Sequence, residues 1–284
     1  MSTTTQDSVP TEADAPEGTE GVSGGAANGA GATGGAGQLG ADMGLSRENL
    51  LEMYSLMATT RAIDERMWVL NRAGKIPFVI SGQGHEGAQV GIAYPLRKGH
   101  DWMVPYYRSV ASLITFGMTP REIMLAQFAR AVDPSSGGRQ MPGHYGTVDR
   151  QIVSVSSPVA TQVLHATGIA LASKMRGLDQ VAITYLGEGS SNQGDFHEAL
   201  NFAGIHKLPV VFVVENNGYA ISVPMNLQSA VEDIAVRGAG YAMPGIIVNG
   251  MEVLECAVMR VTLASIKVGP SPERARSMAS LPMR

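Results

Sequence analysis

Two short apolar segments, separated by a helix-length stretch, constrain the fold of this chain more than any other feature. Val181–Leu186 and Val210–Val214 are almost wholly apolar, and a helical pattern runs between them from about Asp195 to His206. Continuous apolar strands on either side of a helix are typical of a parallel sheet that is buried on both faces. The sequence therefore predicts an α/β domain built around a parallel βαβ unit.

Polar residues follow both predicted strands directly. Glu188 comes after the first strand, and Asn216 and Asn217 come after the second. Ligands of such sheets bind at the carboxyl ends of the strands, which meet at one edge. Carboxylate and carboxamide oxygens suit Mg²⁺, which also takes oxygens from substrate phosphates. This spacing fits a magnesium–phosphate site, and it fits equally well two glycine turns that merely end the strands.

Small residues around Glu188 are compatible with a phosphate. Gly189 would let the backbone approach it closely. Ser190 and Ser191 would donate hydrogen bonds from the start of the following helix, where the helix dipole favours an anion.

The remaining pattern predicts further helices, one extended piece and one long loop. The expected helices span residues 47–73, 86–94, 120–131 and 158–176, the extended piece spans 77–80, and a Gly- and Pro-rich loop spans 133–150. Loops of that length inside a compact domain are usually functional.

The segment from Gly82 to Gly87 matches GxGxxG, the dinucleotide-binding pattern, with Asp101 following. A true fingerprint needs a preceding strand and an acidic residue at the end of the next strand. The preceding apolar piece is too short, and Asp101 follows a polar loop. A glycine turn that opens a helix is therefore preferred over a nicotinamide site.

The N-terminal residues 1–44 form a separate compositional segment. They are rich in Gly and Ala, and they contain acidic residues but no Lys or Arg. We expect this segment to be disordered and to be neither a secretory signal nor a transit peptide. With a net charge of −4, no apolar run of membrane-spanning length and a single cysteine, Cys256, the chain is expected to be cytoplasmic. Nucleic acid and membranes are not expected as partners.

The segment Gly187–Pro224 closely resembles the thiamine-diphosphate motif of the alpha subunits of 2-oxo acid dehydrogenase complexes. The resemblance is strongest to bacterial branched-chain (2-oxoisovalerate) members, and pyruvate and acetoin members are near relatives. It runs from about Leu50 to Glu255, and it implies the thiamine-diphosphate-binding fold. The other matching segments are Asp101–Ser109, Gly137–His144 and Ser156–Gln162.

The resemblance implies a role for each matching residue. Mg²⁺ would be held by Glu188, Asn217 and the carbonyl of Tyr219. Thiamine diphosphate would be bound by Tyr107, Arg108, Ser157, Val159, Gly187, Gly189 and Ser190, with Val159 as the apolar support beneath the bent cofactor. A structural monovalent cation, K⁺ for example, would be held by Ser156, Pro158, Thr161 and Gln162.

Two positions depart from the common family pattern. Many members have Asp at the position of Glu188, and some branched-chain members have Arg at the position of Glu215. The first change keeps a carboxylate ligand. The second removes a charge that would neutralise phosphate.

The implied activity is oxidative decarboxylation of a branched-chain 2-oxo acid, with acyl transfer to the lipoyl domain of an acyltransferase component. The expected assembly is α₂β₂ with a beta subunit that completes the active site. The alternatives are a truncated, non-catalytic subunit, a pyruvate or acetoin dehydrogenase alpha subunit and, last, a nicotinamide dehydrogenase.

The C-terminal segment departs from the family. The expected domains are the tail at 1–44, a cofactor-binding domain at 45–255 and an atypical segment at 256–284, where a frameshift or altered end would explain the loss of an expected HSxxDD loop. His144 then stands as a weak catalytic candidate, with a solvent-exposed loop histidine as the alternative. Cys256 is expected to be inert.

Overall fold

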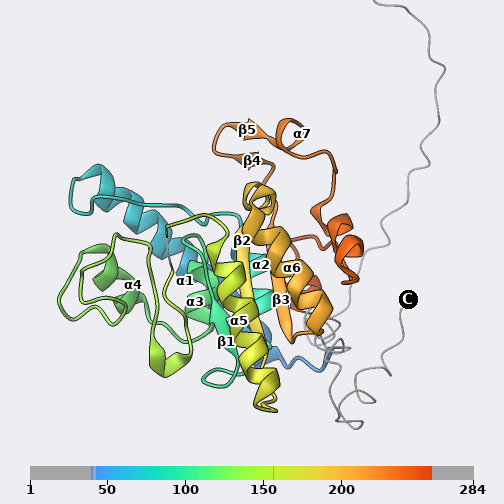
Figure 1. The fold of residues 1–284 in the computed structure, drawn as a ribbon. Helices are drawn as coiled ribbons and strands as arrows, with labels where there is room; N and C mark the ends of the chain where they lie inside the picture. The colour runs from blue at the N-terminus through green and yellow to red at the C-terminus, as the bar shows by residue number, and fades with distance from the viewer. Residues whose placement is uncertain (1–39, 41–42, 156, 258–284) are drawn as a thin grey trace, which may run out of the picture. The chain divides into compact units, whose positions relative to one another are not determined.

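The computed structural model describes Gly40, residues 43–155 and residues 157–257, which all belong to one compact unit. Its helices and strands follow in the order shown in Figure 1. They are α1 (Arg47–Arg72), α2 (Glu86–Ala93), β1 (Trp102–Val104), α3 (Val110–Thr115), α4 (Pro120–Gln127), α5 (Thr161–Met175), β2 (Ala182–Gly187), α6 (Gly194–His206), β3 (Val210–Glu215), β4 (Tyr219–Ala220), β5 (Val223–Pro224) and α7 (Met225–Gln228). Short 3₁₀ helices span Val148–Arg150 (η2), Glu188–Asn192 (η3) and Ile234–Tyr241 (η4).

The centre of the described unit is a parallel sheet in the order β1-β2-β3. β2 and β3 are paired along their whole length, so that Ile183 lies opposite Val211 and Gly187 lies opposite Glu215. Both predicted strands are confirmed, as are the helix between them and the α/β class.

Helices cover both faces of this sheet. In Figure 1, α5 and α6 lie in front of the strands, while α2 and α3 lie behind them. Because side chains alternate along a strand, Ile183 and Val211 pack in the core shared with α1, α2 and α3. Ala182 and Val210 pack against the small residues of α5 and α6.

Local signals fix several helix ends. α1 begins at a capping box formed by Ser46 and Asn49, and α4 begins at one formed by Thr119 and Glu122. Two predicted helices are longer in the sequence reading than in the structure. α4 ends at Gln127, and Ala129 then takes a positive φ; α5 begins at Thr161, after Ala160 with a φ of 73°. The extended piece at 77–80 is not part of a strand.

The segment after β3 crosses the carboxyl ends of the strands. It forms the antiparallel pair β4–β5 and then α7, which lie at the top of Figure 1. Residues 253–257 are helical and bring Cys256 and Ala257 into the core. Within the described part of the chain, no helix combines the length and the apolar character that a membrane crossing needs.

Candidate functional site

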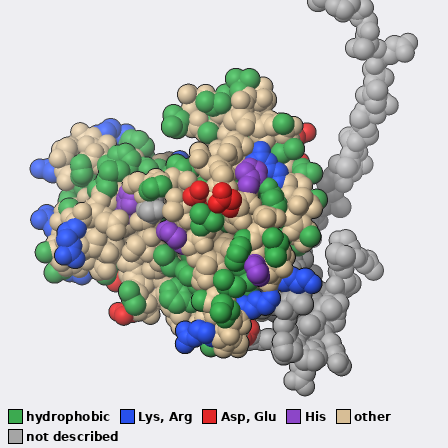
Figure 2. Space-filling model, viewed as in Figure 1, with side chains coloured by type: hydrophobic (Ala, Val, Ile, Leu, Met, Phe, Trp, Pro, Cys, Tyr) green, Lys and Arg blue, Asp and Glu red, His purple; other side chains and the backbone are tan. Residues whose placement is uncertain are grey.

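The carboxyl ends of all three parallel strands carry residues that the sequence singled out. Tyr107 and Arg108 follow β1, Glu188 follows β2, and Asn217 follows β3. Since the strands are parallel and adjacent in space, these residues lie at one edge of the sheet. Figure 2 shows that Lys and Arg lie mainly toward the periphery of the face drawn, so no broad basic surface covers it.

Glu188 is a buried carboxylate that lacks a cationic partner among the described residues. It is 2% exposed, and among the described residues its side chain accepts one long hydrogen bond, at 3.5 Å, from the amide nitrogen of Gln228 to Oε1. The amide oxygen of Gln228 is itself buried and accepts no hydrogen bond from the described residues. Burying a charge without a partner is costly, so this pair of oxygens suits a bound cation. Gln228 was not identified from the sequence, because it lies outside the strand ends.

Asn217 and Tyr219 occupy a tight turn beside Glu188. The side-chain oxygen of Asn217 accepts a hydrogen bond from the backbone N–H of Tyr219 at 3.2 Å. Gly189 packs directly under the next residue of this turn, since a Cβ there would lie 2.6 Å from the Cβ of Ala220. The turn therefore rests on the backbone of Gly189, and only glycine leaves room for it. No three His, Cys, Asp or Glu side chains of the described residues are grouped so that they could hold a metal ion. A metal here would therefore depend on one carboxylate together with amide and carbonyl oxygens.

Ser190 and Ser191 lie in η3 rather than in the first turn of α6, which begins at Gly194. The Ser191 hydroxyl donates to the carbonyl of Glu188 at 2.6 Å and accepts from Arg237 at 2.9 Å. The expectation that Ser191 donates to an anion is therefore wrong, because its hydrogen is already engaged. Ser190 stays a candidate, and it is buried beside Glu188.

Arg108 is tied to the residue that precedes the GxGxxG segment rather than extended into solvent. Its guanidinium donates to the carbonyl of Ser81, and its charged group lies 5.8 Å from the ring centre of Tyr107. Its carbonyl accepts from the Gln89 amide at 3.0 Å. The side chains of Arg108 and Tyr107 therefore lie next to each other after the end of β1.

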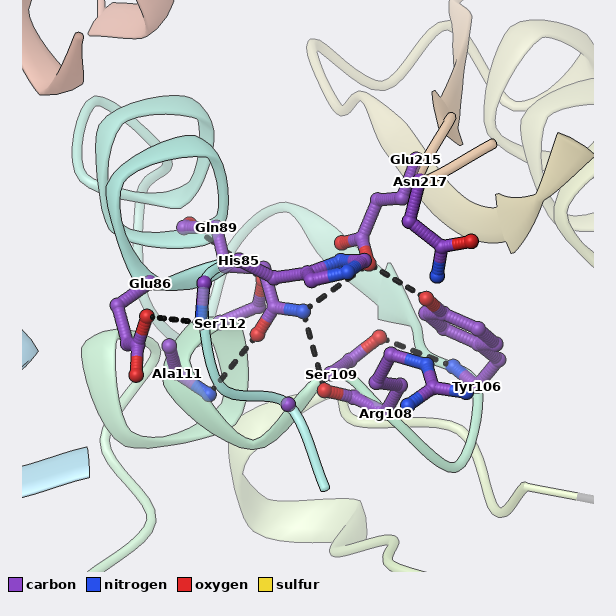
Figure 3. A network of polar contacts seen from close by, with 12 residues as sticks. His85, Glu86, Gln89, Tyr106, Arg108, Ser109, Ala111, Ser112, Glu215 and Asn217 are labelled. Atoms are coloured by element: carbon purple, nitrogen blue, oxygen red, sulfur yellow. Dashed lines mark hydrogen bonds and ion pairs between the residues drawn. The ribbon is translucent and has the colours of Figure 1, made fainter. Parts of the chain in front are cut away.

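Glu215, the last residue of β3, is the centre of a buried polar network that the sequence did not reveal (Figure 3). One carboxylate oxygen, Oε2, accepts from His85 Nδ1 at 2.7 Å, from Gln89 Nε2 at 3.2 Å and from the hydroxyl of Tyr106. The other oxygen, Oε1, is buried without a partner in the described part of the chain. Strand alternation places Glu215 on the α2 side of the sheet, with Val211 and Ile183.

Titration behaviour reflects this burial. Desolvation, together with the negative charge of Glu215, raises the pKa of Tyr106 well above its usual value. Tyr106 therefore stays protonated and remains a donor to Glu215.

The GxGxxG segment is a turn that opens α2, as the sequence indicated. Asp64 of α1 holds it by accepting hydrogen bonds from the Ser81 hydroxyl at 3.0 Å and the Gly82 N–H at 2.6 Å. Burial raises the pKa of Asp64. His85 is the N-cap residue of α2, and its side chain joins this turn to the end of β3. The segment thus borders the site without being a dinucleotide fingerprint.

His144 lies in the long loop but is not solvent-exposed. It is 8% exposed, its Nδ1 lies 3.0 Å from the carbonyl oxygen of Met141, and its Nε2 lies 2.7 Å from the hydroxyl oxygen of Ser157. The alternative of an exposed loop histidine is therefore wrong. Two candidates that the sequence named separately are in direct contact.

The residues expected at the monovalent-cation site are only partly described. Ser156 lies outside the described residues. Pro158 is exposed, Thr161 begins α5, and the buried Gln162 donates to the carbonyl of Tyr185 at 2.9 Å. Val159 is 47% exposed, so its apolar side chain is accessible to a ligand.

A cavity of about 900 Å³ runs along β3 and opens beside the site. Its lining includes His85, Glu215 and Asn217 at one end and Val210 and Val248 along its apolar wall. At its wall lies Cys256, and burial raises the pKa of this thiol to about 11. A thiol with that pKa is almost wholly protonated at neutral pH and is a poor nucleophile.

The fold defines an α/β protein whose candidate site residues cluster at the carboxyl edge of its parallel sheet. Comparison of the sequence with protein families matches residues 54–266 to the family described as dehydrogenase E1 component. The chain belongs to this dehydrogenase E1 component family, and the resemblance noted from the sequence motifs is confirmed.

Individual relatives agree with this assignment. The chain is 57% identical over 213 residues to the 2-oxoisovalerate dehydrogenase subunit alpha of Bacillus subtilis, a match that covers 75% of this chain and 64% of the relative. It is 38% identical to the 3-methyl-2-oxobutanoate dehydrogenase subunit alpha of Mycobacterium tuberculosis, over 80% and 59% of the two chains. It is 39% identical to the pyruvate dehydrogenase E1 component subunit alpha of Staphylococcus aureus, over 74% and 54%.

The chain thus spans less than two thirds of the length of these curated relatives. Among solved structures, a chain described as a thiamin diphosphate-dependent enzyme from Mycobacterium smegmatis matches with a TM-score of 0.36 and 23% identity. The match covers 55% of this chain and 25% of the other, and this likeness is too slight to support an argument.

Proposed function

We propose that this domain binds thiamine diphosphate with Mg²⁺ and serves as the alpha subunit of a branched-chain 2-oxo acid dehydrogenase. The observation that carries the proposal is the buried Glu188, which lacks a cationic partner among the described residues and lies beside Asn217 at the carboxyl edge of the sheet. Such a carboxylate is stable when a cation joins it. The 57% identity to a 2-oxoisovalerate dehydrogenase subunit supports the substrate class.

The chain's own residues would each have a defined task. Glu188, Asn217 and the Tyr219 carbonyl would hold Mg²⁺, and Gly187, Gly189 and Ser190 would adjoin the diphosphate. Arg108 and Tyr107 would bind diphosphate oxygens from the end of β1, where a guanidinium suits a phosphate. When bound, thiamine diphosphate supplies an electron sink for loss of CO₂ from a 2-oxo acid.

The partners belong to the same proposal. A beta subunit in an α₂β₂ assembly would complete the active site, and the lipoyl domain of an acyltransferase component would receive the acyl group. Pro158, Thr161 and Gln162, with Ser156, would hold K⁺, and the protein would work in the cytoplasm. A pyruvate dehydrogenase role is the second candidate, and the Staphylococcus aureus relative favours it.

The cofactor proposal is tested by calorimetric titration of the purified chain with thiamine diphosphate, with and without Mg²⁺. We expect binding only with Mg²⁺, and at least a 10- to 100-fold (~1.4–2.8 kcal/mol) loss of affinity in Glu188→Gln and Asn217→Ala. Glu65→Gln, at an exposed position of α1, is the matched control and should bind like the unmodified chain. Unchanged affinity in both site variants would contradict the proposed site.

The activity proposal needs the partner. A beta subunit and a lipoyl domain should be required for turnover of 3-methyl-2-oxobutanoate, and pyruvate should be the poorer substrate. Full turnover by the isolated chain would contradict the α₂β₂ proposal. Cofactor binding without turnover in the reconstituted complex would instead favour a non-catalytic subunit.

A further inference from the structure

The groups around His144 and Ser157 determine which of the two donates the hydrogen bond between them. His144 Nδ1 lies 3.0 Å from the carbonyl oxygen of Met141. A carbonyl oxygen only accepts hydrogen bonds, so Nδ1 must carry the hydrogen. In the neutral ring the other nitrogen, Nε2, is then the acceptor, and the Ser157 hydroxyl at 2.7 Å donates to it.

This direction limits what Ser157 offers to a ligand. Its one hydroxyl hydrogen is engaged with His144, and its oxygen retains lone pairs on an exposed residue. Phosphate oxygens are acceptors, so Ser157 in this state has no hydrogen for them. A group that carries an N–H or O–H, such as an amine, fits it.

The histidine is well placed to keep this state. His144 is buried, and the backbone carbonyl of Met141 holds its ring from within the same loop. The bond joins the long loop 133–150 to the residues that precede α5, 13 positions further along the chain. A single ring therefore sets both the orientation of the Ser157 hydroxyl and the position of the loop beside it.

We propose that His144 is a positioning residue that turns Ser157 into a hydrogen-bond acceptor for a donor group of the bound cofactor, away from its diphosphate. The inference rests on the proposed function, because it takes thiamine diphosphate as the ligand. It assigns His144 an indirect role in place of the catalytic one suggested by the sequence. That the ligand group must be a hydrogen-bond donor follows from the Nδ1–H···O=C contact of His144 and not from the identity of the cofactor.

Two substitutions at His144 test the contributions of its two ring nitrogens separately. In His144→Asn the side-chain amide can still donate to the Met141 carbonyl but does not reach Ser157. In His144→Gln the longer amide can present its oxygen to Ser157 at the position of Nε2. We expect His144→Asn and Ser157→Ala each to weaken thiamine diphosphate binding by about threefold to tenfold, the worth of one hydrogen bond. His144→Gln should bind within about twofold of the unmodified chain.

The calorimetric titrations use the full chain with saturating Mg²⁺ and two probes, thiamine diphosphate and inorganic pyrophosphate. The Asn and Ala variants should lose affinity for the cofactor and keep their affinity for pyrophosphate. The double variant should lose no more than either single variant, since both remove the same bond. His165→Asn, the same change at an exposed histidine of α5, is the control.

A spectroscopic readout tests the tautomer without any ligand. Long-range ¹H–¹⁵N correlation of ¹⁵N-histidine-labelled protein should show His144 as the Nδ1–H tautomer, and Ser157→Ala should shift its Nε2 resonance. An Nε2–H tautomer, equal losses for pyrophosphate and cofactor, or unchanged cofactor affinity in His144→Asn would each overturn the inference. Failure of the unmodified chain to bind thiamine diphosphate would instead overturn the proposed function, and with it the assignment of the ligand.

Discussion

At the scale of single residues, Glu215 shows how a buried carboxylate can be stabilised by hydrogen-bond donors rather than by a Lys or Arg side chain. Its Oε2 accepts hydrogen bonds from His85, Gln89 and Tyr106. These donors come from the N-cap and the body of α2 and from the segment after β1. Hydrogen bonds to a charged acceptor are stronger than neutral ones, so Glu215 links three segments at the edge that carries the site.

Replacing Glu215 with Ala should therefore lower the free energy of unfolding by on the order of 3 kcal/mol, because the buried Gln89 and Tyr106 and the half-buried His85 lose their acceptor. It should also lower the pKa of Tyr106 toward its usual value. Burial, the larger cause of the raised pKa, would remain, but the charge of Glu215 would be gone. Denaturant titration and the ultraviolet absorbance of tyrosinate against pH measure the two effects.

The sign of the pH dependence follows from the same shift. Since the pKa of Tyr106 is higher in the folded chain than in the unfolded chain, its contribution to stability is complete below pH 10 and is lost as pH rises further. This alkaline loss should be smaller in Glu215→Ala. Glu65→Ala, at an exposed position of α1, should change neither the free energy of unfolding nor the pKa of Tyr106. An equal effect of the two substitutions would contradict the role given to Glu215.

At the scale of elements, the site depends on how the β4–β5 pair rests on η3. Gly189 of η3 has no side chain, and the space above it is filled by Ala220 of β4 and by the amide oxygen of Gln228 in α7. The turn that carries Asn217 and Tyr219 is therefore positioned by close packing rather than by regular strand pairing. A methyl group at Gly189 would move this whole segment away from Glu188.

We expect Gly189→Ala to weaken Mg²⁺-dependent cofactor binding by about tenfold, comparable to the loss of a group that supports a metal ligand. The added Cβ would lie 2.6 Å from the Cβ of Ala220, so β4 must shift. Calorimetric titration measures the affinity. Gly168→Ala in α5 is the matched control, since a Cβ there meets nothing within 4 Å. It should leave binding unchanged and stabilise the helix by about 0.5–1 kcal/mol. Equal binding by both variants would refute the packing argument.

At the scale of the whole described unit, segments far apart in the chain close the core. Gly91 of α2 lies against residues 253–257: a Cβ there would be 2.4 Å from the carbonyl oxygen of Val253 and 2.6 Å from the Cβ of Cys256. Cys256 belongs to the same core cluster as Ile183 and Val211 of the sheet. The helical turn after residue 252 is thus packed into the domain through a glycine more than 160 positions earlier.

Gly91→Ala should destabilise the protein by about 1–3 kcal/mol, the usual cost of overpacking. It should also make the single cysteine accessible. In the unmodified chain, burial and a pKa of about 11 keep the Cys256 thiol unreactive. Thermal unfolding and the rate of reaction with a coloured disulfide reagent measure the two effects. A melting temperature and thiol reactivity equal to those of Gly168→Ala would show that the contact does not matter.

Sequence alone determined the features that depend on local pattern. The apolar runs at β2 and β3 and the residues just after them specified a parallel sheet with Glu188 and Asn217 at one edge, because strand direction and alternation follow from the chain itself. The capping boxes at Ser46 and Thr119 set helix starts, because each box is a contact between residues only three positions apart in the chain.

Tertiary structure decided which distant side chains meet. Periodicity says which face of an element a residue occupies, but it does not say which partner lies opposite. His85 and Glu215 are 130 positions apart, and no sequence pattern indicates their contact. His144 and Ser157 were both candidates, yet only the folding of the loop onto the residues before α5 brought them within 2.7 Å. Hydrogen bonds require distances near 3 Å and defined directions, and these are fixed only when the elements pack.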